Sequence, residues 1–147
     1  FTLSGYAVIM VLADRLGRRD RNVADVTLRD ALVIGCAQAL ALVPGTSRSG
    51  VTISAGRILG FDRHDAARFS FLLSVPVILL ATVYEMGGLF MSDEQVEWTQ
   101  LWVAALVAAV VAYASIDFFM RFVSRIGLLP FAIYRLVLAA VLLYVLV

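Results

Sequence analysis

The sequence predicts an all-α integral membrane protein in which several spanning helices accompany one re-entrant helical hairpin. Of its 147 residues, 62% are hydrophobic and 16% are charged, whereas soluble domains average about 45–50% apolar and about 25% charged residues. Three apolar stretches are long enough to span a membrane, although the last of them is short. A further segment, 31–56, lies between two arginine-bearing connections and is too short to cross a membrane twice. A soluble enzyme, a disordered segment and a free nucleic-acid-binding protein are therefore poor interpretations.

The net charge indicates little about partners, whereas the cysteine content excludes two kinds of site. The net charge is only +1, so it indicates no particular partner, and all twelve basic residues are arginines. The single Cys36 excludes an internal disulfide and a multi-cysteine metal site.

The chain starts within an apolar run, 1–13, that is shorter than the roughly 20 residues of a spanning helix. No charged leader or small-residue cleavage site precedes it, which argues against a signal peptide. We expect 1–13 to be the tail of a transmembrane helix, and the chain to be part of a longer protein.

Three later stretches are predicted to be transmembrane helices, and the connections between them differ in charge. Arginines occupy the connections 14–30, 57–68 and 121–135, whereas 92–98 carries three carboxylates and no arginine. The positive-inside rule then predicts a cytoplasmic linker at 14–30, an outer connection at 92–98, and every arginine except Arg48 on the inner side. The predicted spans are 69–91, 99–120 and 131–147.

The segment 31–60 must leave the cytoplasmic side and return to it. Two full spans would need about 40 residues and a turn, and 31–56 supplies only 26. A re-entrant hairpin fits, with arms at about 31–43 and 50–59 joined by a turn at Pro44–Ser49. The first arm is about 20 Å long, so the tip is expected within the membrane. Irregular backbone at that depth must be buried in protein or line a wet cavity, which makes the tip the candidate site.

The residues of the tip have the chemistry of an anion site. Pro44 ends the first arm, and Gly45 and Gly50 allow tight turns or close approach of a ligand. Ser47 or Ser49 can cap the second arm, whose first N–H groups and dipole favour an anion. Arg48 adds a guanidinium suited to phosphate oxygens. The proposed phosphate-binding residues are Gly45, Thr46, Ser47, Arg48, Ser49 and Gly50, and the hydroxyl of Thr52, one turn after Arg48, is expected to face the same pocket.

Each polar residue also has a plainer interpretation. Serine and threonine in a membrane hairpin often serve helix packing alone, but a cation at membrane depth is costly and indicates function. Gln38 either bonds across helices or reaches the pocket. Glu85 either lies at the membrane interface, the favoured interpretation, or borders the pocket. His64 is predicted to be a solvated loop residue, and Asp117 is expected to pair with Arg121 at i+4.

The run Gly35–Val43 leading into Pro44-Gly45-Thr46-Ser47-Arg48-Ser49-Gly50-Val51-Thr52 closely resembles the second signature of the undecaprenyl-diphosphate phosphatase family, also called bacitracin resistance proteins. Phe69–Pro76 and Tyr134-Arg135 are similar to the same family. The resemblance covers essentially the whole chain, but only the C-terminal half of the family's usual length.

The resemblance implies a fold and an activity. The family has an inverted-repeat fold, of which this chain would be one repeat, and its two re-entrant hairpins meet in a pocket open to the periplasm. It removes the terminal phosphate of undecaprenyl diphosphate in the bacterial inner membrane, which recycles the lipid carrier for cell-wall synthesis. Arg48 matches the family's diphosphate-binding arginine, and Ser47, Ser49 and Thr52 match the hydroxyl groups around it. These four residues are the expected catalytic residues.

Other elements of the family match nothing in this chain. They are a glutamate-rich motif with a serine and a histidine of the first repeat. The nucleophile, the general base and the ligands of a divalent cation, Mg or Ca, are therefore expected in a missing N-terminal half, with no metal ligands in this chain. The expected partners are that half, a polyprenyl diphosphate and the membrane, with no nucleic acid and with a homodimer left open. The alternative function is one non-catalytic half of an anion or lipid transporter, because transporters also place broken helices at a midplane site.

Overall fold

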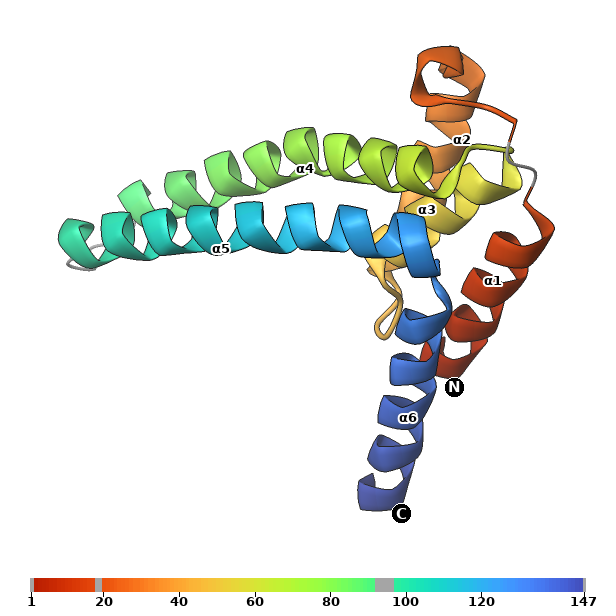
Figure 1. Ribbon diagram of the computed structural model, residues 1–147. Helices are drawn as coiled ribbons and strands as arrows, with labels where there is room; N and C mark the ends of the chain where they lie inside the picture. The colour runs from red at the N-terminus through yellow and green to blue at the C-terminus, as the bar shows by residue number, and fades with distance from the viewer. Residues whose placement is uncertain (1, 18–19, 92–96, 147) are drawn as a thin grey trace.

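The computed structural model describes residues 2–17, 20–91 and 97–146, and the regular structure within these ranges is helical (Figure 1). Two short 3₁₀ turns, η1 (Val23–Asp25) and η2 (Leu40–Leu42), accompany the α-helices. The α-helices are α1 (Thr2–Leu16), α2 (Leu28–Ala39), α3 (Arg48–Ile58), α4 (Arg63–Met91), α5 (Trp98–Ile126) and α6 (Leu129–Leu146).

The helices form a base and an arm. The arm consists of α4 and α5, which lie side by side and extend away from the other helices, while α6 turns off the end of α5 and runs beside α1 (Figure 1). The base comprises α1, α2 and α3 with the adjoining ends of α4, α5 and α6. It contains the hydrophobic core, whose buried members are Met10, Ile34, Ile53, Phe61, Ala66, Ala67, Val123 and Leu128.

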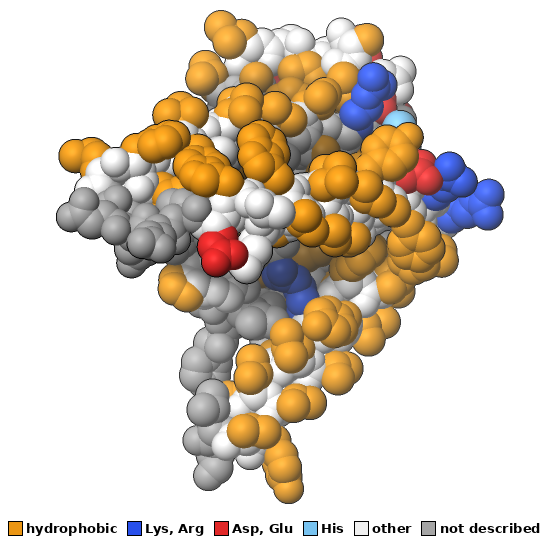
Figure 2. All heavy atoms as spheres, turned by 90° about the vertical axis from the view of Figure 1, so that its left-hand side faces the viewer, with side chains coloured by type: hydrophobic (Ala, Val, Ile, Leu, Met, Phe, Trp, Pro, Cys, Tyr) orange, Lys and Arg blue, Asp and Glu red, His pale blue; other side chains and the backbone are white. Residues whose placement is uncertain are grey.

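The arm has almost no protein around it. Both α4 and α5 are long and apolar enough to cross a membrane, and of their most apolar windows only 17% and 0% of the residues are buried. A helix in the core of a soluble protein would be mostly covered, whereas the apolar side chains of α4 and α5 face outward. Figure 2 shows hydrophobic side chains spread over the face of the molecule from which the arm extends. The exposed apolar surface and the helical fold are those of an all-α membrane protein. The apolar part of α6, Leu129–Val145, is shorter, so a third span at 131–147 stays a prediction.

The segment predicted as a hairpin folds as helix, turn and helix. The first arm starts at Leu28, earlier than expected, because Thr27 caps it and Asp30 completes a capping box. The turn closes with hydrogen bonds from the Thr46 N–H and hydroxyl to the Val43 carbonyl, at 3.1 and 2.6 Å. Gly45 has a φ of +88°, which is the residue and position that a type II turn after proline requires. The re-entrance of this hairpin into a membrane, and the inverted repeat, stay predictions.

The sequence interpretation of His64 as a loop residue is wrong, because His64 lies in the first turn of α4, where it is exposed as expected and contacts Asp65. The basic connection 121–135 and the helix 131–147 overlap in the sequence-based prediction. The structure assigns Arg135 to the helix, since α5 continues to Ile126 and α6 begins at Leu129. A glycine with a φ of +82°, Gly127, makes this short change of direction. The predicted pair of Asp117 and Arg121 is confirmed at 2.8 Å. The connection 92–98, predicted to lie outside, falls largely outside the described residues.

Candidate functional site

The N-terminus of α3 is organised by its serines. Ser47 is the N-cap, and its hydroxyl accepts a hydrogen bond from the Gly50 N–H at 3.2 Å. The Ser49 hydroxyl lies 3.3 Å from that of Ser47. Two hydroxyl groups are therefore held together at the positive end of a helix dipole, where an anion is stabilised.

These serines line a cavity of about 210 Å³, called here the serine–arginine cavity. Its walls come from four helices, so it is formed by the packing of the base and not by the hairpin alone. The lining residues are Met10 of α1, Ser47, Ser49, Gly50 and Ile53 at and after the α3 N-cap, Phe119 of α5, and Leu128, Phe131, Tyr134 and Arg135 at and after the start of α6.

Arg135 is the cation of this cavity, and sequence reasoning did not select it as a site residue. Its Nη1 atom is buried, and no hydrogen-bond acceptor for it lies among the described residues. A buried guanidinium nitrogen without an acceptor is costly, and an anion between Arg135 and the serines would satisfy it. The available signal was a single charge inside an otherwise apolar run, 131–147.

The other predicted tip residues do not line the serine–arginine cavity. Arg48 begins α3 and is half-buried, but it is not among the lining residues. Thr52 is buried, and its hydroxyl lies 2.6 Å from that of Ser70 on α4, not in the serine–arginine cavity. Thr46 and Gly45 form the turn described above. The structure thus brings Ser47, Ser49 and Gly50 together with Arg135, whereas Thr52 links α3 to α4.

Gln38 and Glu85, the two more distant candidates, lie apart from this cavity. Gln38 is partly buried in the last turns of α2, and Glu85 is exposed on α4. Neither lines the serine–arginine cavity.

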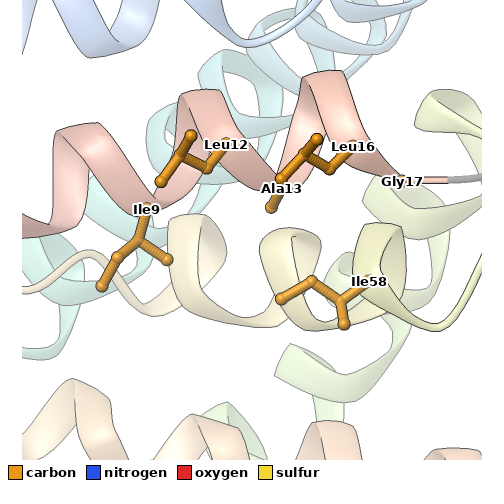
Figure 3. A pocket seen from close by; sticks show the side chains of 6 residues that line it. All are labelled: Ile9, Leu12, Ala13, Leu16, Gly17 and Ile58. Atoms are coloured by element: carbon orange, nitrogen blue, oxygen red, sulfur yellow. The ribbon is translucent and has the colours of Figure 1, made fainter.

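A second hollow, between α1 and α3, has no chemistry of its own (Figure 3). It measures about 280 Å³, and its walls carry no ionisable or hydroxyl side chain. It is lined by Ile9, Leu12, Ala13, Leu16, Gly17 and Ile58.

A divalent cation finds no ligand set in the part of the chain that the structure describes. No three His, Cys, Asp or Glu side chains lie close enough there to hold a metal ion together. The described residues therefore do not form a site for such an ion.

Comparison with known proteins finds one matching family and several relatives that share one name. The family described as "Bacitracin resistance protein BacA" matches residues 1–141. A protein named undecaprenyl-diphosphatase from Nitrosococcus oceani is 52% identical to 95% of this chain, and the match covers 53% of that relative. Relatives of the same name from Thioalkalivibrio sulfidiphilus and Saccharophagus degradans are each 50% identical, over 95% and 92% of this chain and 53% and 51% of their own lengths. The chain spans about half the length of these curated relatives.

Proposed function

Because the chain belongs to the bacitracin resistance protein BacA family, we propose that it is the C-terminal part of an undecaprenyl-diphosphatase. The whole enzyme would hydrolyse undecaprenyl diphosphate to undecaprenyl phosphate and phosphate in the bacterial inner membrane, recycling the lipid carrier for cell-wall synthesis. The names of the three relatives support this proposal.

The observation that carries the proposal is the placement of Arg135 with Ser47 and Ser49 in one cavity. A guanidinium donates two parallel hydrogen bonds to phosphate oxygens, and the start of α3 adds hydroxyl groups and a helix dipole. Together they form a cradle for the terminal phosphate of a diphosphate. Arg48, next to both serines in the sequence, would add a second guanidinium for the phosphate oxygens at the same helix end.

In the proposed reaction, the oxygen of water adds to the terminal phosphorus and the anhydride P–O bond breaks. The leaving oxygen stays with undecaprenyl phosphate. Negative charge spreads over the phosphoryl oxygens in the transition state, and the cradle stabilises it. We propose that the group activating water, and the ligands of any Mg or Ca ion, belong to the N-terminal half.

We also propose a membrane placement. The tip of the α2–α3 hairpin would re-enter the membrane and open, with the serine–arginine cavity, toward the periplasm. An N-terminal half with a matching hairpin would face it, completing an inverted repeat. The arginine-bearing connections 14–30 and 57–68 and the junction between α5 and α6 would lie in the cytoplasm, as the positive-inside rule predicts, with Arg135 deeper along α6.

The test is an assay of the chain with and without its proposed other half. We expect the chain alone to release no phosphate from undecaprenyl diphosphate, because it lacks a positioned nucleophile. Co-expression with the N-terminal half of the Nitrosococcus oceani relative, called here the paired protein, should restore hydrolysis in detergent. The measurement is phosphate release, with and without a divalent cation.

The control is the paired protein with Ser47 and Ser49 both changed to alanine, which should be inactive. Turnover by the chain alone would place the nucleophile within this chain. A paired protein that binds a polyprenyl diphosphate but never hydrolyses it would favour the transporter alternative.

A further inference from the structure

Three charged side chains from three helices meet inside the base, and they are called here the charge cluster. Asp14 of α1 is 4% exposed and Arg57 of α3 is 0% exposed. The Asp14 carboxylate accepts two hydrogen bonds from Arg63 of α4, at 2.7 and 2.9 Å. It also lies 3.3 Å from the Arg57 guanidinium. None of the three members of the cluster lines the serine–arginine cavity.

The charge cluster also reaches a fourth helix. The Leu128 N–H, directly before α6, donates to the same Asp14 carboxylate at 3.4 Å. Next to it, a Cβ on Gly127 would lie 2.8 Å from that carboxylate and 2.9 Å from Arg63. Arg57 donates to the Phe61 carbonyl at 2.6 Å and to the Asp14 carbonyl at 2.9 Å. One carboxylate thus holds the end of α3, the start of α4 and the start of α6.

Stability alone does not account for such an arrangement. Buried ion pairs are weak contributors to stability, and apolar residues of similar volume often replace them at no cost. The shared carboxylate fixes the positions of the helices relative to one another. Its bidentate contact with Arg63 and its contact with Leu128 form only when α4 and the start of α6 lie at particular positions beside α1.

The helices fixed in this way carry both sides of the serine–arginine cavity. Ser49 lies eight residues before Arg57 along α3, and Arg135 lies seven residues after Leu128 along α6. At about 1.5 Å per residue, each is about 10–12 Å of rigid helix from the charge cluster. A rotation of α6 at its start would therefore move Arg135 relative to the two serines.

We propose that Asp14 is a positioning residue for the diphosphate site: it sets α6 against α3 and so sets the spacing between Arg135 and Ser49. This inference rests on the proposed function. Asp14 acts through the helices and touches no reacting atom.

The experiment compares Asp14→Asn with Asp30→Asn in the paired protein. Asp30 is a matched control, because it is also a buried carboxylate in a bidentate pair, with Arg21 at 2.6 and 3.2 Å, but among the described residues none of its hydrogen bonds reaches α6. Both variants should lower the Tm. We expect only Asp14→Asn to lower kcat, by about 10–100-fold, since a displacement of about 1 Å can cost that much.

Equal effects of the two variants on kcat, or an unchanged kcat in Asp14→Asn, would overturn the proposal. An inactive wild-type paired protein would instead count against the proposed function, so the two failures are distinguishable.

A second variant covers the case in which Asp14→Asn does not fold. Arg63→Lys keeps the charge but cannot make both contacts with the carboxylate. We expect a several-fold loss of kcat that largely disappears when Arg135→Lys is already present, because both changes act through the same contact. Losses that simply multiply would show that Arg63 and Arg135 act independently and would overturn the proposal.

Discussion

Arg135 and Arg125 lie on neighbouring helices, yet only Arg135 lines the serine–arginine cavity. In the paired protein we expect Arg135→Lys to lower kcat about 100–1000-fold, the usual cost of one strong transition-state contact. The charge is kept, but an ammonium cannot make the two parallel hydrogen bonds of a guanidinium. We expect Arg48→Lys to lose most activity for the same reason. Arg125→Lys, on an exposed residue of α5, is the control and should keep the wild-type rate of phosphate release.

Local chemistry was enough to predict part of the site at the residue scale. The Pro44–Gly45 turn and the Ser47 cap depend only on neighbouring residues, and both are found in the structure. Arg135 was missed because its place depends on where α5 ends and α6 begins. Thr52 has the expected helical spacing from Arg48, but its hydroxyl turns to Ser70, and only the packing of α3 on α4 decides this.

At the scale of one element, the α2–α3 turn should depend on Gly45. Gly45→Ala should lower the free energy of unfolding of the paired protein by about 1–2 kcal/mol, because alanine is strained at a φ of +88°. Gly35→Ala is the matched control, since a Cβ there meets nothing within 4 Å and the residue lies inside α2. Alanine at that helical position should leave stability equal or higher. Denaturation in detergent measures both, and a harmless Gly45→Ala would contradict the turn geometry.

The linker between α1 and α2 should make stability depend on pH. The hydrogen bond from Arg21, followed by those from Thr27, holds the pKa of Asp30 well below its usual range. A depressed folded-state pKa means that the ionised form stabilises the fold above the ordinary Asp pKa of about 3.9, and that this contribution is lost as pH falls below it. The Tm difference between the paired wild-type protein and Asp30→Asn should therefore shrink from pH 6 to pH 3. A constant difference would show that Asp30 does not supply this dependence.

At the scale of the whole molecule, the arginine distribution predicts an orientation. Single cysteines at Asn22 and Gln95, in a Cys36→Ala background, should react with an impermeant reagent from opposite sides of the membrane, because 14–30 is basic and 92–98 is acidic. Labelling of both cysteines from one side would contradict the orientation and the hairpin argument.

The sequence was enough to predict the all-helical class and the order of the helices, because both depend on apolar stretches and on charge. It was not enough to predict the contacts that build the base, because these join residues far apart in the chain, such as Asp14 and Leu128.

The uncovered arm has a consequence for the lipid in which the protein works. Each of its helices has 29 residues and is about 43 Å long, whereas the hydrocarbon core of a bilayer is about 30 Å thick. Long apolar helices adapt to such a mismatch by tilting. The start of α4 is held by Asp14, and α5 passes into α6 through Gly127 and Leu128. A change in bilayer thickness would therefore change the tilt of α4 and α5, and through α5 it would turn α6, the helix that carries Arg135.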